Sequence, residues 1–362
     1  MALDERIKEV FSEQNLKLYS SKQDSPLREI SSKEKLVAYL DSENLPLSEE
    51  VIVETHLGNG GRQNTYRISI GNKLYAASIR KEKISDGETK HAFTLDDINA
   101  IPSIIPTYGL IRTRCQGEEY YFGTICRLIK NGMDLEWFIE RNGYSPERGP
   151  INKDYLASVL SYLNQMLRSI KRLREKKLVH RDFKNSNILI EGKNAFLTDF
   201  DLMQHKNAIT GSRIVGTAIF MSTEVLRAEP LDFRADLYSW AVCLAEGVGY
   251  LNPMRYNDSR LSLSKVMDDI CDKDYLPKEE DKRLKHLPEE LIRPITYILK
   301  SGLNPNREKR DIDMILSIFK EPGISDYLVR AQTENMDAKY DEPLLPVRKK
   351  SFWNFFKFGK RS

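Results

Sequence analysis

The chain has 362 residues, 40% of them hydrophobic, and a formal net charge of +3 at pH 7. This length exceeds what one small hydrophobic core needs, and so small a charge gives no indication of nucleic-acid binding. The 4 cysteines and 5 histidines show no metal-binding or disulfide spacing, the start has no signal-peptide pattern, and no apolar run reaches the roughly 18 residues that span a bilayer. We therefore expect a cytoplasmic protein.

The first 48 residues are rich in charge and predict two short helices, at 4–14 and 32–40, around a polar linker that contains Pro26. Ser32 precedes a charged helical run and is a typical N-cap residue. We expect these residues to form an N-terminal extension.

Three β-strands are predicted after the extension because apolar and polar residues alternate there. They span 51–57, 65–70 and 74–80. The turn between the first two strands is rich in glycine, with Gly58, Gly60 and Gly61. Missing Cβ atoms would let backbone N–H groups approach a bound phosphate. An ordinary hairpin turn is the alternative interpretation.

Two acids and an amide gather around a predicted hairpin in the middle of the chain. Residues 188–190 and 195–197 predict short strands that a tight turn connects. Antiparallel pairing would bring Asn187, before the first strand, beside Asp199, after the second, with Asp182 a few residues earlier. Because carboxylate and amide oxygens are ligands that Mg²⁺ selects, the sequence predicts a site for metal-bound phosphate.

The residues around this hairpin resemble the catalytic loop and metal-binding motif of eukaryotic-type Ser/Thr protein kinases. The resemblance lies in His180-Arg181-Asp182, the following Lys184 and Asn187, and Asp199-Phe200 downstream. Three further motifs stand in the order found in this family. They are Gly216-Thr217 through Glu224, which resembles the close of an activation segment, Asp236 through Ala241, which resembles the start of the large buried helix, and Arg310, near the position of the arginine that pairs with Glu224.

The resemblance implies a role for each residue of the catalytic loop. Asp182 would accept the proton of the substrate hydroxyl, and Lys184 would neutralise the transferring phosphate. Asn187 and Asp199 would hold Mg²⁺. The lysine two residues after Asp182 favours Ser/Thr over Tyr specificity.

The resemblance also implies a regulated activation segment. Arg181 would meet a phosphate or an acid there, and phosphorylation of Thr210 or Ser212 could order the segment through charge-assisted hydrogen bonds. Thr217 would contact Asp182 and the substrate. His180 would pack and donate hydrogen bonds, without a chemical role.

The nucleotide-binding part of the sequence departs from the family pattern. Ser78 stands where the family places the lysine that grips the ATP phosphates. Arg80, two residues along the same strand face, or Arg62 in the glycine-rich turn could supply the missing cation. The with-no-lysine kinases resemble this arrangement, although their replacement position is Gln63 here. The third expected glycine is also Gln63.

Two further positions are less determined. The helix that normally donates a glutamate to the lysine would lie between about 85 and 100, and Glu88, Asp96 and Asp97 are its candidate acids. Asp201 replaces the glycine of Asp-Phe-Gly. Aspartate tolerates positive φ better than most residues, so we expect the turn to persist with an added carboxylate beside the metal site.

The end of the chain, residues 348–361, is basic and aromatic and contains no acid. As a helix it would carry phenylalanines on one face and lysines and an arginine on the other, a pattern typical of helices on anionic membrane surfaces. An aromatic anchor packed on the folded domain and a calmodulin-like partner site are the alternatives.

The sequence thus predicts an α+β, two-lobed protein kinase fold. Its parts would be the extension at 1–48, an antiparallel-sheet N-lobe at 49–129, a mainly helical C-lobe at 130–330 and the tail at 331–362. The implied activity is ATP- and Mg-dependent phosphorylation of protein substrates in the cytosol. If the protein is a secreted bacterial effector, this would be the cytosol of a host cell. A pseudokinase scaffold is the alternative. Small-molecule kinases are a more distant one, because they usually lack the motif from Gly216-Thr217 to Glu224 that ends the activation segment.

Overall fold

The computed structural model describes residues within 51–333 and none of 1–50 or 334–362, so the predicted extension helices and the basic, aromatic residues 348–361 lie outside the described residues. Residues 331–333, which the sequence assigned to the tail, lie in the last helix that the structure describes. The undescribed segments inside this range are 60–62, 71–72, 81–94, 116–117, 130–131, 145–150, 207–213, 251–266, 269, 272–274 and 279–280. The chain divides into two compact units. The described residues of the first lie in 51–100 and 105–129, and those of the second in 101–104 and 132–333.

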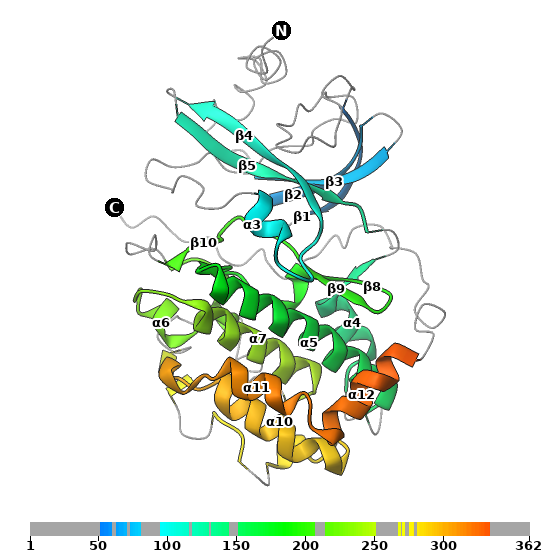
Figure 1. The fold of residues 1–362 in the computed structure, drawn as a ribbon, viewed down its shortest axis with the longest axis vertical. Coiled ribbons are helices and arrows are strands. Elements are labelled where there is room, and N and C mark those ends of the chain that lie inside the picture. Colours follow the sequence, from blue (N-terminus) through cyan, green and yellow to red (C-terminus); the bar gives the residue numbers. More distant parts are fainter. Residues whose placement is uncertain are drawn as a thin grey trace. The chain divides into compact units, whose positions relative to one another are not determined.

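The first unit is built on a five-stranded antiparallel sheet with the strand order β1-β2-β3-β5-β4 (Figure 1). Its strands are β1 (Val51–Asn59), β2 (Gln63–Ile70), β3 (Lys73–Arg80), β4 (Thr107–Cys115) and β5 (Glu118–Arg127). The three predicted strands are confirmed, and they pair antiparallel in chain order.

One face of this sheet is apolar and the other carries hydroxyl groups. Tyr66, Ile68 and Ala77 lie on the apolar face and are buried. Thr65 and Ser78 pair across β2 and β3 on the opposite face. The short helix α3 (Leu95–Asn99) is held to β4, because the side chain of Asn99 bonds both the carbonyl and the N–H of Thr107, at 2.8 and 3.1 Å.

The second unit is mainly helical (Figure 1). Its helices are α4 (Leu135–Asn142), α5 (Lys153–Glu175), α6 (Thr223–Leu226), α7 (Phe233–Gly247), α10 (Glu289–Gly302), α11 (Ile312–Ile318) and α12 (Pro322–Thr333). Its short strands are β6 (Met133–Asp134), β7 (Leu178–Val179), β8 (Ile188–Glu191), β9 (Asn194–Leu197) and β10 (Gln204–His205). An antiparallel-sheet lobe and a helical lobe confirm the predicted α+β fold.

Helix α7 forms the centre of the second unit. Every residue from Ala235 to Gly247 is buried, and the helix packs against α5 and α10. Trp240 is fully buried and donates its indole N–H to the carbonyl of Leu163 in α5 at 2.8 Å. Because all its sides are covered, α7 is a fixed support for the segments that attach to it.

Helix α12 adds a further layer along α5 near the end of the described chain. Arg330 forms an ion pair with Asp154 in the first turn of α5. Lys193, in the turn between β8 and β9, donates to the carbonyl of Gln332 at 2.5 Å. Helix α12 therefore fixes the far end of the β8–β9 hairpin.

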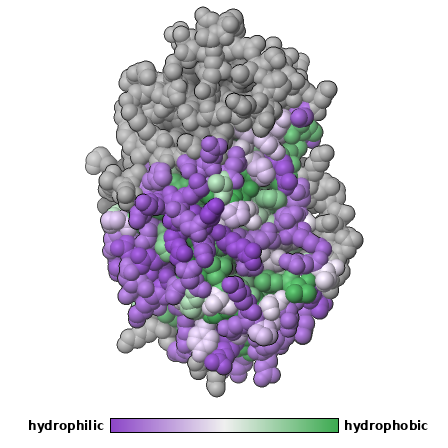
Figure 2. Space-filling view, in the orientation of Figure 1, coloured by the Kyte–Doolittle hydropathy of each residue, from purple (hydrophilic) through white to green (hydrophobic). Residues whose placement is uncertain are grey.

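The described surface of the second unit is largely hydrophilic on the face that Figure 2 shows, where apolar side chains form only separate patches. Within the described part of the chain, no helix combines the length and the low charge that crossing a membrane requires.

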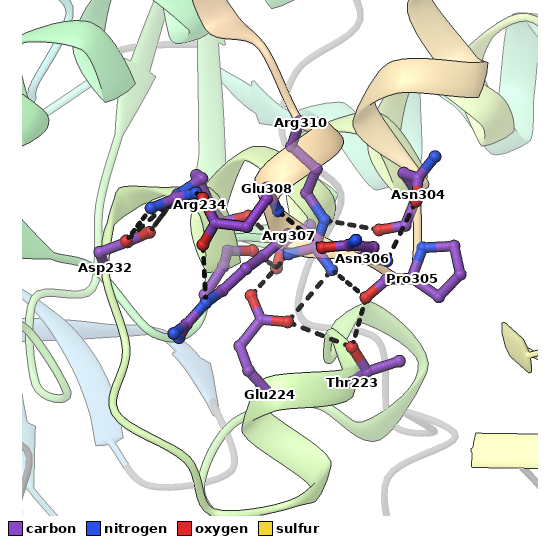
Figure 3. A network of polar contacts seen from close by, with 12 residues as sticks. Thr223, Glu224, Asp232, Arg234, Asn304, Pro305, Asn306, Arg307, Glu308 and Arg310 are labelled. Atoms are coloured by element: carbon purple, nitrogen blue, oxygen red, sulfur yellow. Dashed lines mark hydrogen bonds and ion pairs between the residues drawn. The ribbon is translucent and has the colours of Figure 1, made fainter.

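A buried ion pair joins α6 to the loop before α11 (Figure 3). Arg310 donates to both carboxylate oxygens of Glu224, at 2.5 and 3.1 Å, and the two side chains are 0% and 3% exposed. The guanidinium also donates to the carbonyls of Asn304 and Arg234, at 2.7 and 3.0 Å. The expected pairing of Arg310 with Glu224 is confirmed, and all the charge is matched by planar, two-point contacts.

Replacing Arg310 by alanine should destabilise the second unit strongly, because Glu224 would remain buried without its cation. We expect a loss of about 3–5 kcal/mol in the free energy of unfolding. Urea unfolding followed by tryptophan fluorescence would measure it, since Trp240 reports on the core of this unit. Arg227→Ala is the matched control, because Arg227 pairs with Glu229 on the surface. Equal losses of unfolding free energy for the two variants would show that the buried pair of Arg310 and Glu224 stabilises the unit no more than a surface pair does.

Candidate active site

The segment between β7 and β8 is anchored by a buried histidine. His180 is fully buried, its ring packs edge-on against Phe183 and Phe200, and Nε2 donates to the carbonyl of Thr198 at 3.1 Å. Burial lowers the pKa of His180 to about 4, so the ring is neutral near pH 7. The packing and hydrogen-bonding role expected for His180 is confirmed.

Asp236, in the first turn of α7, holds the backbone of the same segment. Its carboxylate accepts the N–H of His180 at 2.7 Å and the N–H of Arg181 at 2.9 Å. Burial raises the pKa of Asp236 to about 7, and the two N–H donors oppose that rise. The backbone of Arg181 is left-handed, with φ of 70°, so Asp236 fixes a strained conformation directly before Asp182.

Asp182 lies between a lysine and a threonine. Lys184 donates to Oδ2 of Asp182 at 2.7 Å, and the hydroxyl of Thr217 donates to Oδ1 at 3.0 Å. Lys184 also contacts the hydroxyl of Thr217 at 3.2 Å. Burial by itself would raise the pKa of Asp182, but the charge and hydrogen bond of Lys184 bring it below its usual value. Asp182 is therefore an oriented carboxylate, and its expected contact with Thr217 is confirmed.

Asn187 ends a short 3-10 turn, η2 (Asn185–Asn187), and is hydrogen-bonded to the same aspartate. Its side-chain amide donates to the carbonyl of Asp182 at 2.8 Å and to Oδ2 of Asp182 at 3.3 Å. Because Nδ2 is used in this way, Oδ1 is the atom of Asn187 that could bind a cation.

The predicted hairpin is present and brings Asn187 and Asp199 to its open end. Strands β8 and β9 pair antiparallel, with Ile188 opposite Leu197, and the N–H of Thr198 donates to the carbonyl of Asn187 at 2.9 Å. Asp199 follows directly and has a left-handed backbone, with φ of 63°. The two residues thus flank the last pair of the ladder.

Negative charge accumulates at this end of the hairpin. Burial, together with the nearby carboxylates of Asp201 and Asp182, raises the pKa of Asp199 to about 7. A divalent cation would offset that charge, so the oxygen donors of Asp199 and Asn187 fit Mg²⁺. Among the described residues no group of three or more acids, histidines or cysteines could hold a metal alone. Water molecules and substrate phosphate oxygens are the usual further ligands of Mg²⁺ in sites with so few protein ligands.

The turn at Asp201 is present, with an added carboxylate as expected from the substitution of aspartate for glycine. Positive φ occurs at Asp199, whereas Asp201 is not among the described residues with positive φ. The turn therefore does not require the tolerance of aspartate for positive φ at position 201. Asp201 is buried, and its contribution to the site is charge.

The activation segment is described only at its two ends. Arg181 donates to the side-chain oxygen of Gln204 at 2.8 Å. This contact is with an uncharged amide, whereas the sequence predicted a phosphate or an acid as the partner of Arg181. Gly216 has φ of 114°, and a Cβ added there would lie 2.7 Å from the carbonyl oxygen of Arg181. Thr210 and Ser212 lie outside the described residues, so their regulatory role stays a prediction.

In the first unit, Ser78 is engaged by its neighbour across the sheet. The hydroxyl groups of Ser78 and Thr65 are hydrogen-bonded at 3.1 Å. At Gly58, an added Cβ would meet nothing within 4 Å, so glycine is not sterically required there. Arg80 lies in β3 with an undescribed side chain.

The other candidates of this unit are placed only in part. Gly60, Gly61, Arg62 and Glu88 lie outside the described residues. Asp96 and Asp97 lie in α3, with Asp96 exposed. The structure therefore leaves the source of a phosphate-binding cation as a prediction.

Comparison with known proteins places this geometry in a family. The model of the protein kinase domain matches residues 52–312. A probable serine/threonine-protein kinase of Clostridium acetobutylicum is 23% identical over 206 residues, which cover 55% of this chain and 30% of that protein. The serine/threonine-protein kinase Sgk3 of Rattus norvegicus is 26% identical over 210 residues, 56% of this chain and 39% of that protein. This chain spans well under half the length of these relatives. Because the family match covers most of the chain, the chain belongs to the eukaryotic-type protein kinase superfamily.

Proposed function

We propose that this chain is an active Ser/Thr protein kinase that uses ATP and Mg²⁺. The observation that carries the proposal is the arrangement around Asp182, a carboxylate of lowered pKa that Lys184 and Thr217 orient. Two non-glycine residues of the site, Arg181 and Asp199, keep left-handed backbones. Strain of this kind persists only where the surrounding structure enforces it, and it clusters at active sites.

In the proposed reaction, the oxygen of a substrate hydroxyl attacks the γ-phosphorus of ATP, its proton passes to Asp182, and ADP leaves. Asp182 would orient the hydroxyl as well as accept the proton. Lys184, 2.7 Å from Asp182, would stabilise charge on the transferring phosphoryl group. Asn187 and Asp199 would hold Mg²⁺, which offsets the charge of the phosphates when it is bound.

The competing function is a pseudokinase scaffold, and Ser78 is the observation that favours it. A hydroxyl that is hydrogen-bonded to Thr65 provides no positive charge for the ATP phosphates. Against it stands the complete set of chemical groups in the second unit, which a scaffold would not need. We propose that Arg80 or Arg62 supplies the missing cation.

Changing Asp182 to asparagine should abolish phosphate transfer, because an amide cannot accept the hydroxyl proton. We expect at least about a 100-fold loss of incorporation from radiolabelled ATP, the size usual for a general base, with little change in ATP binding. Asp313→Asn is the matched control, since Asp313 lies on the surface of the same unit and pairs with Arg174. Wild-type protein that modifies neither itself nor any substrate would support the scaffold instead.

Changing Gly216 to alanine should also reduce the rate, because the new Cβ would collide with the carbonyl of Arg181 and displace the backbone next to Asp182. We expect a loss of more than tenfold in kcat, since misplaced catalytic groups are costly. Gly249→Ala is the control, because Gly249 has φ of 69° and close contacts away from the site. Similar kcat values for the two alanine variants would show that Gly216 has no specific role in placing Asp182.

We also propose that the tail attaches the kinase to anionic membranes. Its basic residues are Arg348, Lys349, Lys350, Lys357, Lys360 and Arg361. Each such charge near an anionic surface contributes about 1 kcal/mol, and the aromatic side chains between them suit the headgroup region. A cytosolic kinase with this tail would act on substrates at the membrane.

Sedimentation with liposomes would test the tail. Full-length protein should bind vesicles that contain phosphatidylserine, and a variant that ends at Pro346 should bind at least tenfold more weakly. Vesicles of phosphatidylcholine alone serve as the uncharged control, and added salt should weaken binding because it screens surface charge. Equal sedimentation of the two proteins would exclude this role.

A further inference from the structure

A buried hydrogen bond joins the catalytic segment to the far end of α7. Asn185 is 1% exposed, and its side-chain N–H₂ donates to Oε2 of Glu246 at 2.5 Å. Glu246 lies in the last turn of α7 and is also buried. A hydrogen bond to a buried carboxylate is among the stronger ones in proteins, and a carboxylate deprived of its donor is costly to bury.

The orientation of the Asn185 amide is fixed by this contact. Its Oδ1 is buried and accepts no hydrogen bond within the described part of the chain. Turning the amide over would place Oδ1 against a carboxylate oxygen at the same short distance. Because two acceptors repel each other, only one orientation of Asn185 is compatible with Glu246.

Asn185 lies in the chain between Lys184 and Asn187, which would bind the transferring phosphate and Mg²⁺ in the proposed reaction. It follows Lys184 directly and opens the turn η2, in which the N–H of Asn187 donates to the carbonyl of Lys184 at 3.0 Å. The N–H of Ile188 then donates to the carbonyl of Asn185. Holding the side chain of Asn185 therefore restrains the backbone on both sides of it, from Lys184 to the start of β8.

Two acids on one helix thus hold the two halves of the catalytic segment. Asp236 holds its beginning through the N–H groups of His180 and Arg181. Glu246 lies ten residues further along α7, about 15 Å at the helical rise of about 1.5 Å per residue, and holds Asn185. The helix between the two acids is buried throughout, so their separation is fixed.

We propose that Glu246 is a positioning residue that, through Asn185, sets the placement of Lys184 and Asn187 for phosphoryl transfer. This role rests on the proposed kinase function. Glu246 touches neither the phosphate nor the metal. Its effect would therefore be seen in kcat and in the Mg²⁺ concentration needed for half-maximal activity, with the KM for a peptide substrate unchanged.

Reversing the hydrogen bond tests this role. Asn185→Asp would place two carboxylates in contact, and we expect kcat to fall 10- to 100-fold while half-saturation by Mg²⁺ rises. Adding Glu246→Gln restores a donor, now on the side of α7, and the double variant should recover to within about fivefold of wild type. Glu246→Gln alone should lose only a few fold, because its oxygen can still accept from Asn185.

Tyr155→Phe is the matched control for stability. The hydroxyl of Tyr155 donates to the carbonyl of Gly247, the neighbour of Glu246, at 2.7 Å. Removing it deletes a buried hydrogen bond beside Glu246 without involving Asn185, so thermal stability should fall and kcat should not. A fall in kcat equal to that of Asn185→Asp would show a merely structural effect and overturn the proposal.

The remaining outcomes separate this inference from the kinase proposal. If Asn185→Asp does not fold, the double variant is compared with Asn185→Ala, which it must exceed in kcat. An active wild type with no recovery in the double variant would overturn the role of Glu246 alone. An inactive wild type would overturn the proposed function. The role of Glu246 would then be tested by calorimetry, as the affinity for ATP at limiting Mg²⁺: Asn185→Asp should weaken binding, and the double variant with Glu246→Gln should restore it.

Discussion

The geometry of the candidate active site depends on the carboxylate of Asp236 and the two backbone N–H groups that it accepts. Asp236 begins a helix that is buried on every side, so its position is set by the core of the second unit. Its bonds to His180 and Arg181 hold a left-handed backbone at Arg181. The packing of α7 thereby keeps Arg181, directly before Asp182, in a conformation that a free loop would seldom adopt.

The carboxylates at the open end of the β8–β9 hairpin have unequal surroundings, and this inequality suits the two roles that the proposed reaction gives them. Asp182 has Lys184 as its partner and keeps a lowered pKa, whereas Asp199 is buried beside two other acids and has a raised one. One carboxylate is thus prepared to orient a hydroxyl, and the other to bind a positive ion. Lys184 distinguishes the two carboxylates because it donates a hydrogen bond to Asp182 at 2.7 Å, and this bond together with its charge keeps the pKa of Asp182 low.

The sequence predicted those features that local patterns or charge determine. The hairpin followed from strand alternation around a turn, and the Glu224–Arg310 pair from opposite charges in recognised motifs. It could not predict the left-handed backbone of Asp199, because backbone strain depends on what tertiary contacts enforce. It also missed the contact between Arg181 and Gln204, since an uncharged amide carries no signal of a distant partner. Long-range contacts between neutral polar groups are visible only in the folded chain.

The departure at Ser78 affects nucleotide binding and leaves proton transfer unaffected. A hydroxyl pair with Thr65 satisfies both side chains but contributes no charge, and charge is what a lysine offers to phosphate. Asp182, Lys184 and Thr217 are held by contacts within the second unit, so none of their geometry requires a lysine in β3. We therefore expect the substitution to lower affinity for ATP more than it lowers the rate of transfer from bound ATP. In the proposed kinase, transfer from bound ATP would then depend on how firmly α7 holds the catalytic segment.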